Sequence, residues 1–355
     1  MTTNTAELYK NSLRAEMMQI ERRHRLLEQQ RLQRNTNLDK HRKIIQNLRL
    51  HQQNFHRPNY QRRAYRNVLQ FSEWMHERPD DLENWFVLPC PKGVRCLLVA
   101  EGGRTEAIGK WGNLLLTFQS MLPGGSTGEG NHRGDTTIID AFFDKEEGHF
   151  IAIDVLAYGN QDFMNCDCEF RFYWLNTKIQ EDNLGKGTKR KFPIKSVPYA
   201  SFQDPLAVDE LLGRFPAFPG NKPKLDGLLF YHKESLYKSG KTPLVLWLFP
   251  FMVPEVLNLH SVHEAYMSQK PSHYEGYKQY IAEFDAKQAK KVDQRTQRRE
   301  QRKSTKMDCQ DESQSTSKES EEKPEEEEIE TRDKIDQEMF LLECEIEDTL
   351  DKSMQ

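Results

Sequence analysis

The sequence contains no run of eighteen apolar residues, and its amino terminus has no apolar stretch of the kind found in a signal peptide. We therefore expect a soluble protein that is neither secreted nor embedded in a membrane. The six cysteines form no CxxC pair and no Cys/His spacing typical of a zinc site. These absences predict reduced thiols, no metal ion and no cofactor.

Apolar residues are scarce, at 36% of the 355 residues, and the mean hydropathy is −0.84. The polarity lies mainly at the two ends, because residues 65–265 have the composition of an ordinary globular domain. Residues 1–50 hold eleven Lys/Arg against five Asp/Glu, and residues 307–355 hold five against nineteen. Opposite charge in separate blocks indicates interaction tails, and solvated termini without a partner are the alternative.

These shifts predict four regions: a basic helical arm at 1–50, a linker at 51–64, a globular domain at 65–265 and a charged, largely disordered tail at 266–355. Residues 6–50 contain no Gly or Pro and are rich in Glu, Gln, Arg and Leu, which favours a helix. The apolar stripe of that helix is thin, so we expect it to be ordered best on a partner.

The globular region alternates short apolar runs with Gly, Pro, Asp and Asn, which is typical of strands. The runs are 85–88, 94–100, 136–143, 150–156, 168–175, 227–231 and 243–249, and Cys166 and Cys168 would share one face of a strand. A short helix is predicted at 66–76 and another at 204–214, the latter capped by Asp204. The fold class predicted is α+β, with mostly antiparallel sheet.

Two segments, 226–230 and 242–248, resemble the strands that line the nucleotide pocket of ATP-dependent ligases and mRNA-capping guanylyltransferases. In those enzymes the second segment carries lysines that contact phosphate. This sequence instead has Leu246 and Leu248 on either side of Trp247. Loss of the cations and gain of an indole favour holding a purine over activating a phosphate.

The chain also resembles the snurportins, import adaptors for spliceosomal small nuclear ribonucleoproteins, over roughly residues 8–265. The likeness is carried by the segments 72–74, 90–95, 122–125, 170–174, 226–232 and 242–250. The resemblance implies a guanylyltransferase-like domain that binds the 2,2,7-trimethylguanosine cap of U snRNA. It also implies an importin-β-family import receptor, an export receptor and shuttling between nucleus and cytoplasm, with no membrane partner.

Trp247 is the predicted platform for the cap, because a guanine methylated at N7 is cationic and gains from stacking on an electron-rich indole. The two methyl groups on N2 need apolar contact, and Phe71 and Trp74 match the family's wall there, with Ser72 between them offering hydrogen bonds. Cys90, Arg95 and Lys110 match further contact positions. Arg95 and Lys110 would meet the triphosphate or the next nucleotide.

Each of these residues has a plainer interpretation. Trp247 lies in so apolar a run that it would ordinarily be assigned to the core. Cys90 would be a small buried apolar residue, and Arg95 and Lys110 would be surface charges.

The carrier-binding residues implied by the resemblance are the basic side chains of the amino-terminal arm, which would meet the acidic inner surface of a receptor. They are Arg22, Arg23, Arg25, Arg31, Arg34, Lys40, Arg42 and Lys43. The arm departs from a dense basic ligand, because His24 interrupts the run and residues 35–37 are Asn-Thr-Asn. A different importin, or a basic helix that touches RNA, stays open.

An active nucleotidyltransferase is the alternative function, because Lys224-Leu225-Asp226-Gly227 fits the K-x-D-G string of covalent nucleotide transfer. Its position argues against it. The catalytic lysine of those enzymes comes early in the domain, whereas only about 20 residues separate Lys224 from Trp247 here. A general RNA-binding protein that ignores the cap is the third possibility, and it predicts binding that depends steeply on salt.

Overall fold

In the computed structural model the described residues are 19–31, 64–127, 134–186, 192–287 and 290. The chain divides into two units, Met1–Lys270 with Met339–Gln355, and Pro271–Glu338. In the second unit residues 277–287 are helical. Most of the predicted linker, and the tail beyond residue 290, lie outside the described residues.

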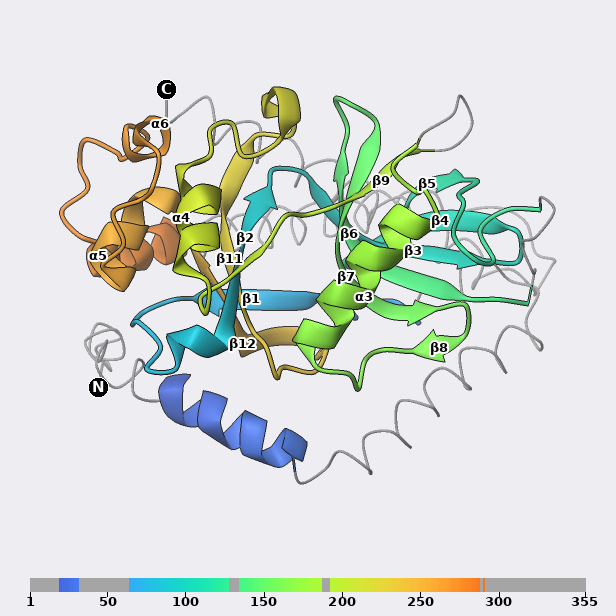
Figure 1. The fold of residues 1–355 in the computed structure, drawn as a ribbon, viewed down its shortest axis with the longest axis horizontal. Helices are drawn as coiled ribbons and strands as arrows, with labels where there is room; N and C mark the ends of the chain where they lie inside the picture. Colours follow the sequence, from blue (N-terminus) through green and yellow to red (C-terminus); the bar gives the residue numbers. More distant parts are fainter. Residues whose placement is uncertain (1–18, 32–63, 128–133, 187–191, 288–289, 291–355) are drawn as a thin grey trace, which may run out of the picture. The chain divides into compact units, whose positions relative to one another are not determined.

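One sheet of the first unit has five strands (Figure 1). Their order is β1 (Gln70–Trp74), β12 (Gly240–Leu248), β11 (Leu225–His232), β2 (Trp85–Pro91) and β10 (Ala200–Ser201). All neighbours are antiparallel except β1 and β12, which run parallel. The two segments that resemble a nucleotide pocket therefore lie side by side, as β11 and β12.

The second sheet has seven strands. Its main path is β5 (Leu114–Phe118), β4 (Arg104–Gly109), β3 (Val94–Glu101), β6 (Thr137–Asp144), β7 (His149–Tyr158) and β8 (Gln161–Asp162), and β9 (Ile194–Ser196) pairs parallel to β7. Mostly antiparallel sheet with helices confirms the predicted α+β class. Six of the seven predicted apolar strands are also confirmed, with ends shifted by a few residues.

The longer helices described in the first unit are α3 (Cys168–Glu181), α4 (Pro205–Gly213) and residues 19–31, which form the helix drawn in dark blue in Figure 1. The short ones are η2 (Leu82–Asn84), η3 (Pro219–Asn221), η4 (Pro250–Met252), α5 (Val253–Leu257) and α6 (Glu264–Met267). The predicted start of α4 is confirmed, since the Asp204 side chain accepts a hydrogen bond from the Ala207 amide and Pro205 opens the helix.

The remaining predicted strand, 168–175, is wrong, because these residues form the first half of α3. Asp167 caps the helix by accepting a hydrogen bond from the Phe170 amide, so Cys166 and Cys168 do not alternate along a strand. The buried positions recur every three or four residues, at Cys168, Arg171, Phe172, Leu175 and Ile179. That spacing is helical, and the aromatic content of the segment hid it.

The helix predicted at 66–76 is also wrong, because residues 70–74 form β1. Pairing with β12 supplies the hydrogen bonds that a helix would have made internally. Phe71 and Trp74 have the aromatic character that strands favour. The correction matters because β1 carries three of the predicted cap contacts.

Apolar side chains from both sheets meet in one core. Leu88, Leu229 and Val245 of the first sheet cluster with Phe142 and Ile151 of the second. Cys168 and Phe172 bring α3 into the same cluster. This shared core packs the two sheets against each other, and residues at its margin can contact side chains of both sheets.

A fully buried ion pair joins α3 to β7. The Arg171 guanidinium donates to both carboxylate oxygens of Asp154, at 2.8 and 2.9 Å. It also donates to the backbone oxygens of Cys166 and Ser235. Because neither charged group reaches solvent, removing one would leave the other charge buried without its counter-charge.

We expect Arg171→Met to lower the free energy of unfolding by about 3 to 5 kcal/mol, because Asp154 would keep its burial and lose its cation. Denaturant unfolding followed by circular dichroism measures the change. Arg214→Met is the matched control, since Arg214 pairs with Glu210 on the exposed face of α4. It should cost about 1 kcal/mol or less. Equal losses for the two variants would contradict this assignment.

Candidate functional site

Trp247 lies near the end of β12, between β1 and β11. It is half-buried and pairs across the sheet with Trp74 on one side and Leu229 on the other. The ring centroids of Trp74 and Trp247 are 4.9 Å apart with an interplanar angle of 76°, an edge-to-face contact. The indole is therefore at the margin of the core, not sealed inside it.

Gly227 of β11 determines how close the indole can come to the backbone. A Cβ atom at this position would lie 2.3 Å from Cζ2 of Trp247 and 2.4 Å from Cε2. Real Cβ atoms do not approach ring carbons so closely, so any other residue would displace the ring. A glycine inside a strand here marks close approach of a side chain to the backbone.

Two further residues complete the surroundings of Trp247. Phe249 contacts it edge-to-face with centroids 4.5 Å apart. Cys90 of β2 is opposite Gly227 in the sheet and 5% exposed, and it belongs to the core cluster against which Trp247 packs. Cross-strand partners share a face, so Cys90, Gly227 and Trp247 lie on the same face of the sheet.

Phe71, near the start of β1, connects this group to two cations, Arg95 on β3 and Lys110 in the turn that follows β4. The Lys110 ammonium lies 4.6 Å from the centroid of the Phe71 ring, and the Arg95 guanidinium lies 5.8 Å from it. Phe71 itself packs against a cluster that includes Leu97 and Ile108 of the second sheet. The structure thus brings Phe71, Arg95 and Lys110 together. Trp74, also on β1, and Trp247, on the paired strand β12, form a second group.

Ser72 lies between these groups on β1 and is half-buried. The pairing of β1 with β12 is irregular between Phe71 and Glu73, so Ser72 is at the irregularity. Interrupted pairing leaves backbone polar groups for partners outside the ladder. This is compatible with the predicted hydrogen-bonding role of Ser72.

Arg95 is held rigidly by groups that the sequence did not indicate. It donates to both oxygens of Asp140, at 3.0 and 2.9 Å, and Asp140 is fully buried. The Tyr237 hydroxyl donates to Asp140 at 2.7 Å and accepts from the Gln70 amide at 3.1 Å. Burial alone would lower the pKa of Arg95, but the Asp140 charge outweighs it and raises that pKa well above its usual range.

Sequence reasoning missed five residues of this region: Gly227, Phe249, Asp140, Tyr237 and Glu73. Gly227 had a visible signal, because a glycine interrupts an otherwise apolar strand. Asp140 and Tyr237 had none, since they are 97 positions apart and meet only in the fold.

Only half of the basic residues predicted to bind a carrier lie among the described residues. Arg22, Arg23, Arg25 and Arg31 lie on the helix at 19–31, whereas Arg34, Lys40, Arg42 and Lys43 lie outside the described residues. Within the helix, Arg22 and Arg31 pair with acidic residues of the domain and Arg23 is buried.

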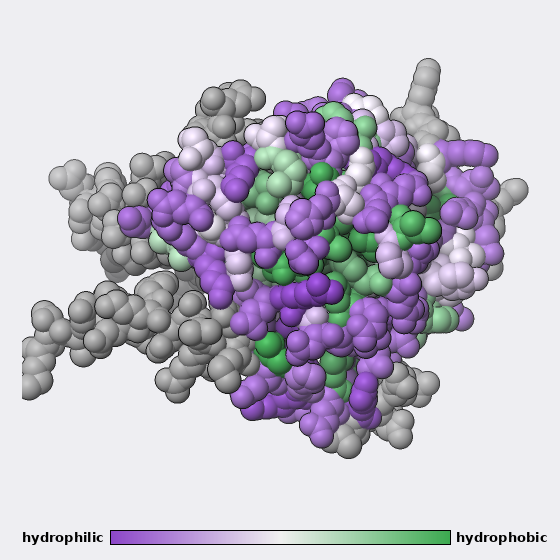
Figure 2. Space-filling model, turned by 60° about the vertical axis from the view of Figure 1, so that its left-hand side comes forward, coloured by the Kyte–Doolittle hydropathy of each residue, from purple (hydrophilic) through white to green (hydrophobic). Residues whose placement is uncertain are grey.

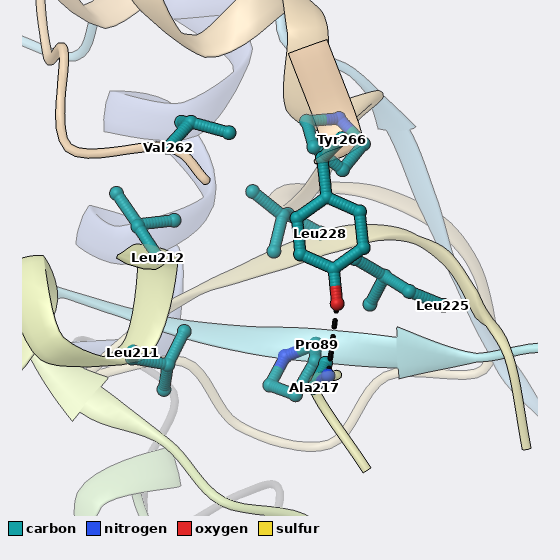
Figure 3. A pocket seen from close by; sticks show the side chains of 9 residues that line it. Pro89, Leu211, Leu212, Ala217, Leu225, Leu228, Val262 and Tyr266 are labelled. Carbon is teal, nitrogen blue, oxygen red and sulfur yellow. Dashed lines mark hydrogen bonds between the residues drawn. The ribbon is translucent and has the colours of Figure 1, made fainter. Parts of the chain in front are cut away.

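A separate apolar hollow lies on the other face of the first sheet (Figure 3). It is lined by Pro89, Leu211, Leu212, Ala217, Leu225, Leu228, Pro250, Val262 and Tyr266. Its single polar contact in the figure is the hydrogen bond from the Ala217 amide to the Tyr266 hydroxyl, at 2.8 Å. Leu228 and Pro89 are register partners, one position out of step with Leu229 and Trp247, so the hollow is not part of the Trp247 site.

One face of the molecule is mostly hydrophilic (Figure 2). Figure 2 shows polar side chains over most of this face, with apolar groups in the gaps between them.

Lys224, the residue that covalent nucleotide transfer would require, is exposed. In the part of the chain that the structure describes, no three His, Cys, Asp or Glu side chains gather as a metal site, and no helix is long and apolar enough to cross a membrane.

Solved structures similar to this chain include DNA ligases. A Lig E DNA ligase matches at 15% identity over 51% of this chain and 67% of its own, with a TM-score of 0.32. Mycobacterial DNA ligase D complexed with ATP and MES matches at 14% identity over 51% and 60%, with a TM-score of 0.32. The ligase domain of M. tuberculosis LigD matches at 14% identity over 51% and 59%, with a TM-score of 0.33. The chain thus covers less than two thirds of the latter two.

The family match covers every described strand of both sheets. Residues 68–250 match the family described as Snurportin1, m3G cap-binding domain. The match begins just before β1 and ends just after β12, so it includes Trp74, Gly227 and Trp247. Because this span is just over half of the chain, the protein belongs to the family of the Snurportin1 m3G cap-binding domain.

Proposed function

We propose that this protein is a non-catalytic import adaptor that binds the 2,2,7-trimethylguanosine cap of U snRNA and links the capped particle to an importin-β-family receptor. An export receptor would return it, so that it shuttles between nucleus and cytoplasm. The observation that carries the proposal is the half-buried Trp247 indole held against Gly227 beside Trp74, within the span matched by the cap-binding family.

The chemistry of the cap fits these groups. Methylation at N7 makes the guanine cationic, and a cationic ring stacks well on an indole. The N2 methyl groups require apolar contact, which Trp74 supplies next to Trp247. Arg95 and Lys110 supply positive charge for the triphosphate, and Asp140 keeps the Arg95 guanidinium in one orientation.

The absence of catalysis is supported by what flanks the platform. Leu246 and Leu248 are fully buried where the related enzymes place phosphate-binding lysines. A nucleophilic lysine must be desolvated and close to the phosphate. Lys224 is exposed, which does not meet that requirement.

Trp247→Ala should weaken binding of a trimethylguanosine cap analogue by about 1 to 3 kcal/mol, because the stacking surface is lost. Isothermal titration calorimetry measures the affinity, and unfolding transitions check the fold. Trp174→Ala is the matched control, since Trp174 is another half-buried indole, on α3, packed against Phe163. Equal weakening by both variants, or equal loss for uncapped RNA, would count against a cap platform. A labelled GTP adduct lost in Lys224→Ala would instead identify a nucleotidyltransferase.

Gly227→Ala should also weaken cap binding, by about tenfold or more, because the new methyl group must push the Trp247 ring out of place. The same calorimetric titration measures it. Gly185→Ala is the control, since a Cβ atom there meets nothing within 4 Å. Unchanged cap affinity in Gly227→Ala would show that the ring position is not important for binding.

Carrier binding is tested without disturbing the helix at 19–31. Replacing Arg34, Lys40, Arg42 and Lys43 together by Gln should reduce affinity for an importin-β-family receptor by at least about tenfold, since each removes a charge-assisted contact. Cap affinity should stay the same. Pull-down with purified receptor and capped RNA reads both, and unaltered receptor binding would exclude this segment as the carrier ligand.

A further inference from the structure

The helix at 19–31 is docked on the same domain that carries Trp247. Its residues contact a surface we call the helix-binding rim: Glu73 and Trp74 of β1, Trp85 at the start of β2, and Glu234 and Leu236 after β11. The helix residues turned to the domain include Gln19 and Arg23, which are 3% and 5% exposed. Their spacing of four positions puts them on one helix face.

The amino-terminal end of the helix is fastened at Glu73. Arg22 donates to both oxygens of the Glu73 carboxylate, each at 2.8 Å, and Gln19 donates to the same carboxylate at 3.0 Å and to the Trp74 carbonyl at 3.1 Å. Burial acts to raise the pKa of Glu73, but the hydrogen bonds from Arg22 and Gln19 outweigh it, so the pKa lies below its ordinary value. Glu73 is therefore an ionised anchor.

The middle of the helix inserts a cation into the rim. The Arg23 guanidinium lies 5.1 Å from the centroid of the Trp85 ring. Burial lowers the pKa of Arg23, and the nearby carboxylates oppose this shift: Asp81, Asp80, Glu73 and Glu77. Asp81 is held in place by hydrogen bonds with the Trp85 indole and His232. The rim is thus an acidic surface with an aromatic floor, and it fits a basic helix.

The carboxyl-terminal end is held on the opposite side of the rim. Arg31 donates to Glu234 at 2.6 Å, and the Gln30 side chain accepts from the Leu236 amide at 3.4 Å. Arg31 and Glu234 are both well exposed, so this pair adds little stability by itself. It does fix the direction of the helix on the domain.

We propose that the helix-binding rim is a docking site from which the chain's own basic helix can be displaced. The rim and the import receptor then compete for this helix. Arg23 is buried against the rim, so it cannot contact an acidic receptor at the same time, and the N–H groups that Arg22 donates to Glu73 are occupied while the helix is docked. This rests on the proposed function only in its second half, since docking is independent of any carrier. Docking then weakens the apparent receptor affinity by the factor one plus the docking equilibrium constant.

Glu73→Gln tests the proposal in the full-length protein, because it weakens the rim and leaves the helix sequence intact. Loss of this partly exposed bidentate pair should reduce docking by about three- to tenfold. Hydrogen exchange of amides 19–31, measured without receptor, should show protection in the native chain that falls by that factor. Affinity for purified importin-β-family receptor should rise by up to the same factor. Glu210→Gln is the control, because it breaks an Arg–Glu pair within α4 and should change neither readout.

The outcomes separate the two halves. An unprotected helix in the native chain, or protection unchanged by Glu73→Gln, would overturn the rim as a receptor for the helix. A helix that is released in Glu73→Gln without tighter receptor binding would overturn the competition. Absence of receptor binding in every variant would overturn the proposed carrier function and the competition with it, while the exchange data still decide whether the rim holds the helix.

Discussion

The position of Trp247 depends on a side chain that residue 227 lacks. Without a Cβ atom on Gly227 the indole comes against the backbone of β11, and Trp74 and Phe249 meet it edge-to-face from neighbouring segments. A ring fixed in this way loses little conformational freedom when a ligand stacks on it, so more of the stacking energy appears as affinity. Leu246 and Leu248, on either side of Trp247, are fully buried and anchor β12 in the core.

The charged half of the site depends on a different constraint. Arg95 belongs to the second sheet, yet its orientation is set by Asp140 and Tyr237, and Tyr237 also binds the backbone of β1 at Gln70. This buried network connects the strand that carries Ser72 and Trp74 to the sheet that carries Arg95. Buried polar networks of this kind favour one relative arrangement of the elements that they join. Trp247 and Arg95 can then keep a constant relation although they lie on separate sheets.

Much of the fold was predictable because the six longest strands of the described residues contain apolar runs rich in β-branched and aromatic residues, such as 94–100 and 243–249. The errors have physical causes. The run 168–175 reads equally as strand or helix, and the Asp167 cap with burial every three or four residues decides for helix. Residues 70–74 become a strand only because β12 pairs with them from far along the chain. Trp247 and Trp74 could be predicted from the family likeness, whereas Asp140, Tyr237 and the docking of Arg23 on Trp85 depend on contacts that a single sequence does not display.

The most direct measurement is a titration of the native protein's tryptophan fluorescence with a trimethylguanosine cap analogue and, separately, with its unmethylated counterpart. Stacking of a cationic purine on Trp247 predicts saturable quenching by the methylated analogue and much weaker quenching by the unmethylated one, because only the methylated base carries the positive charge. Equal quenching by both, or none by either, would contradict the account.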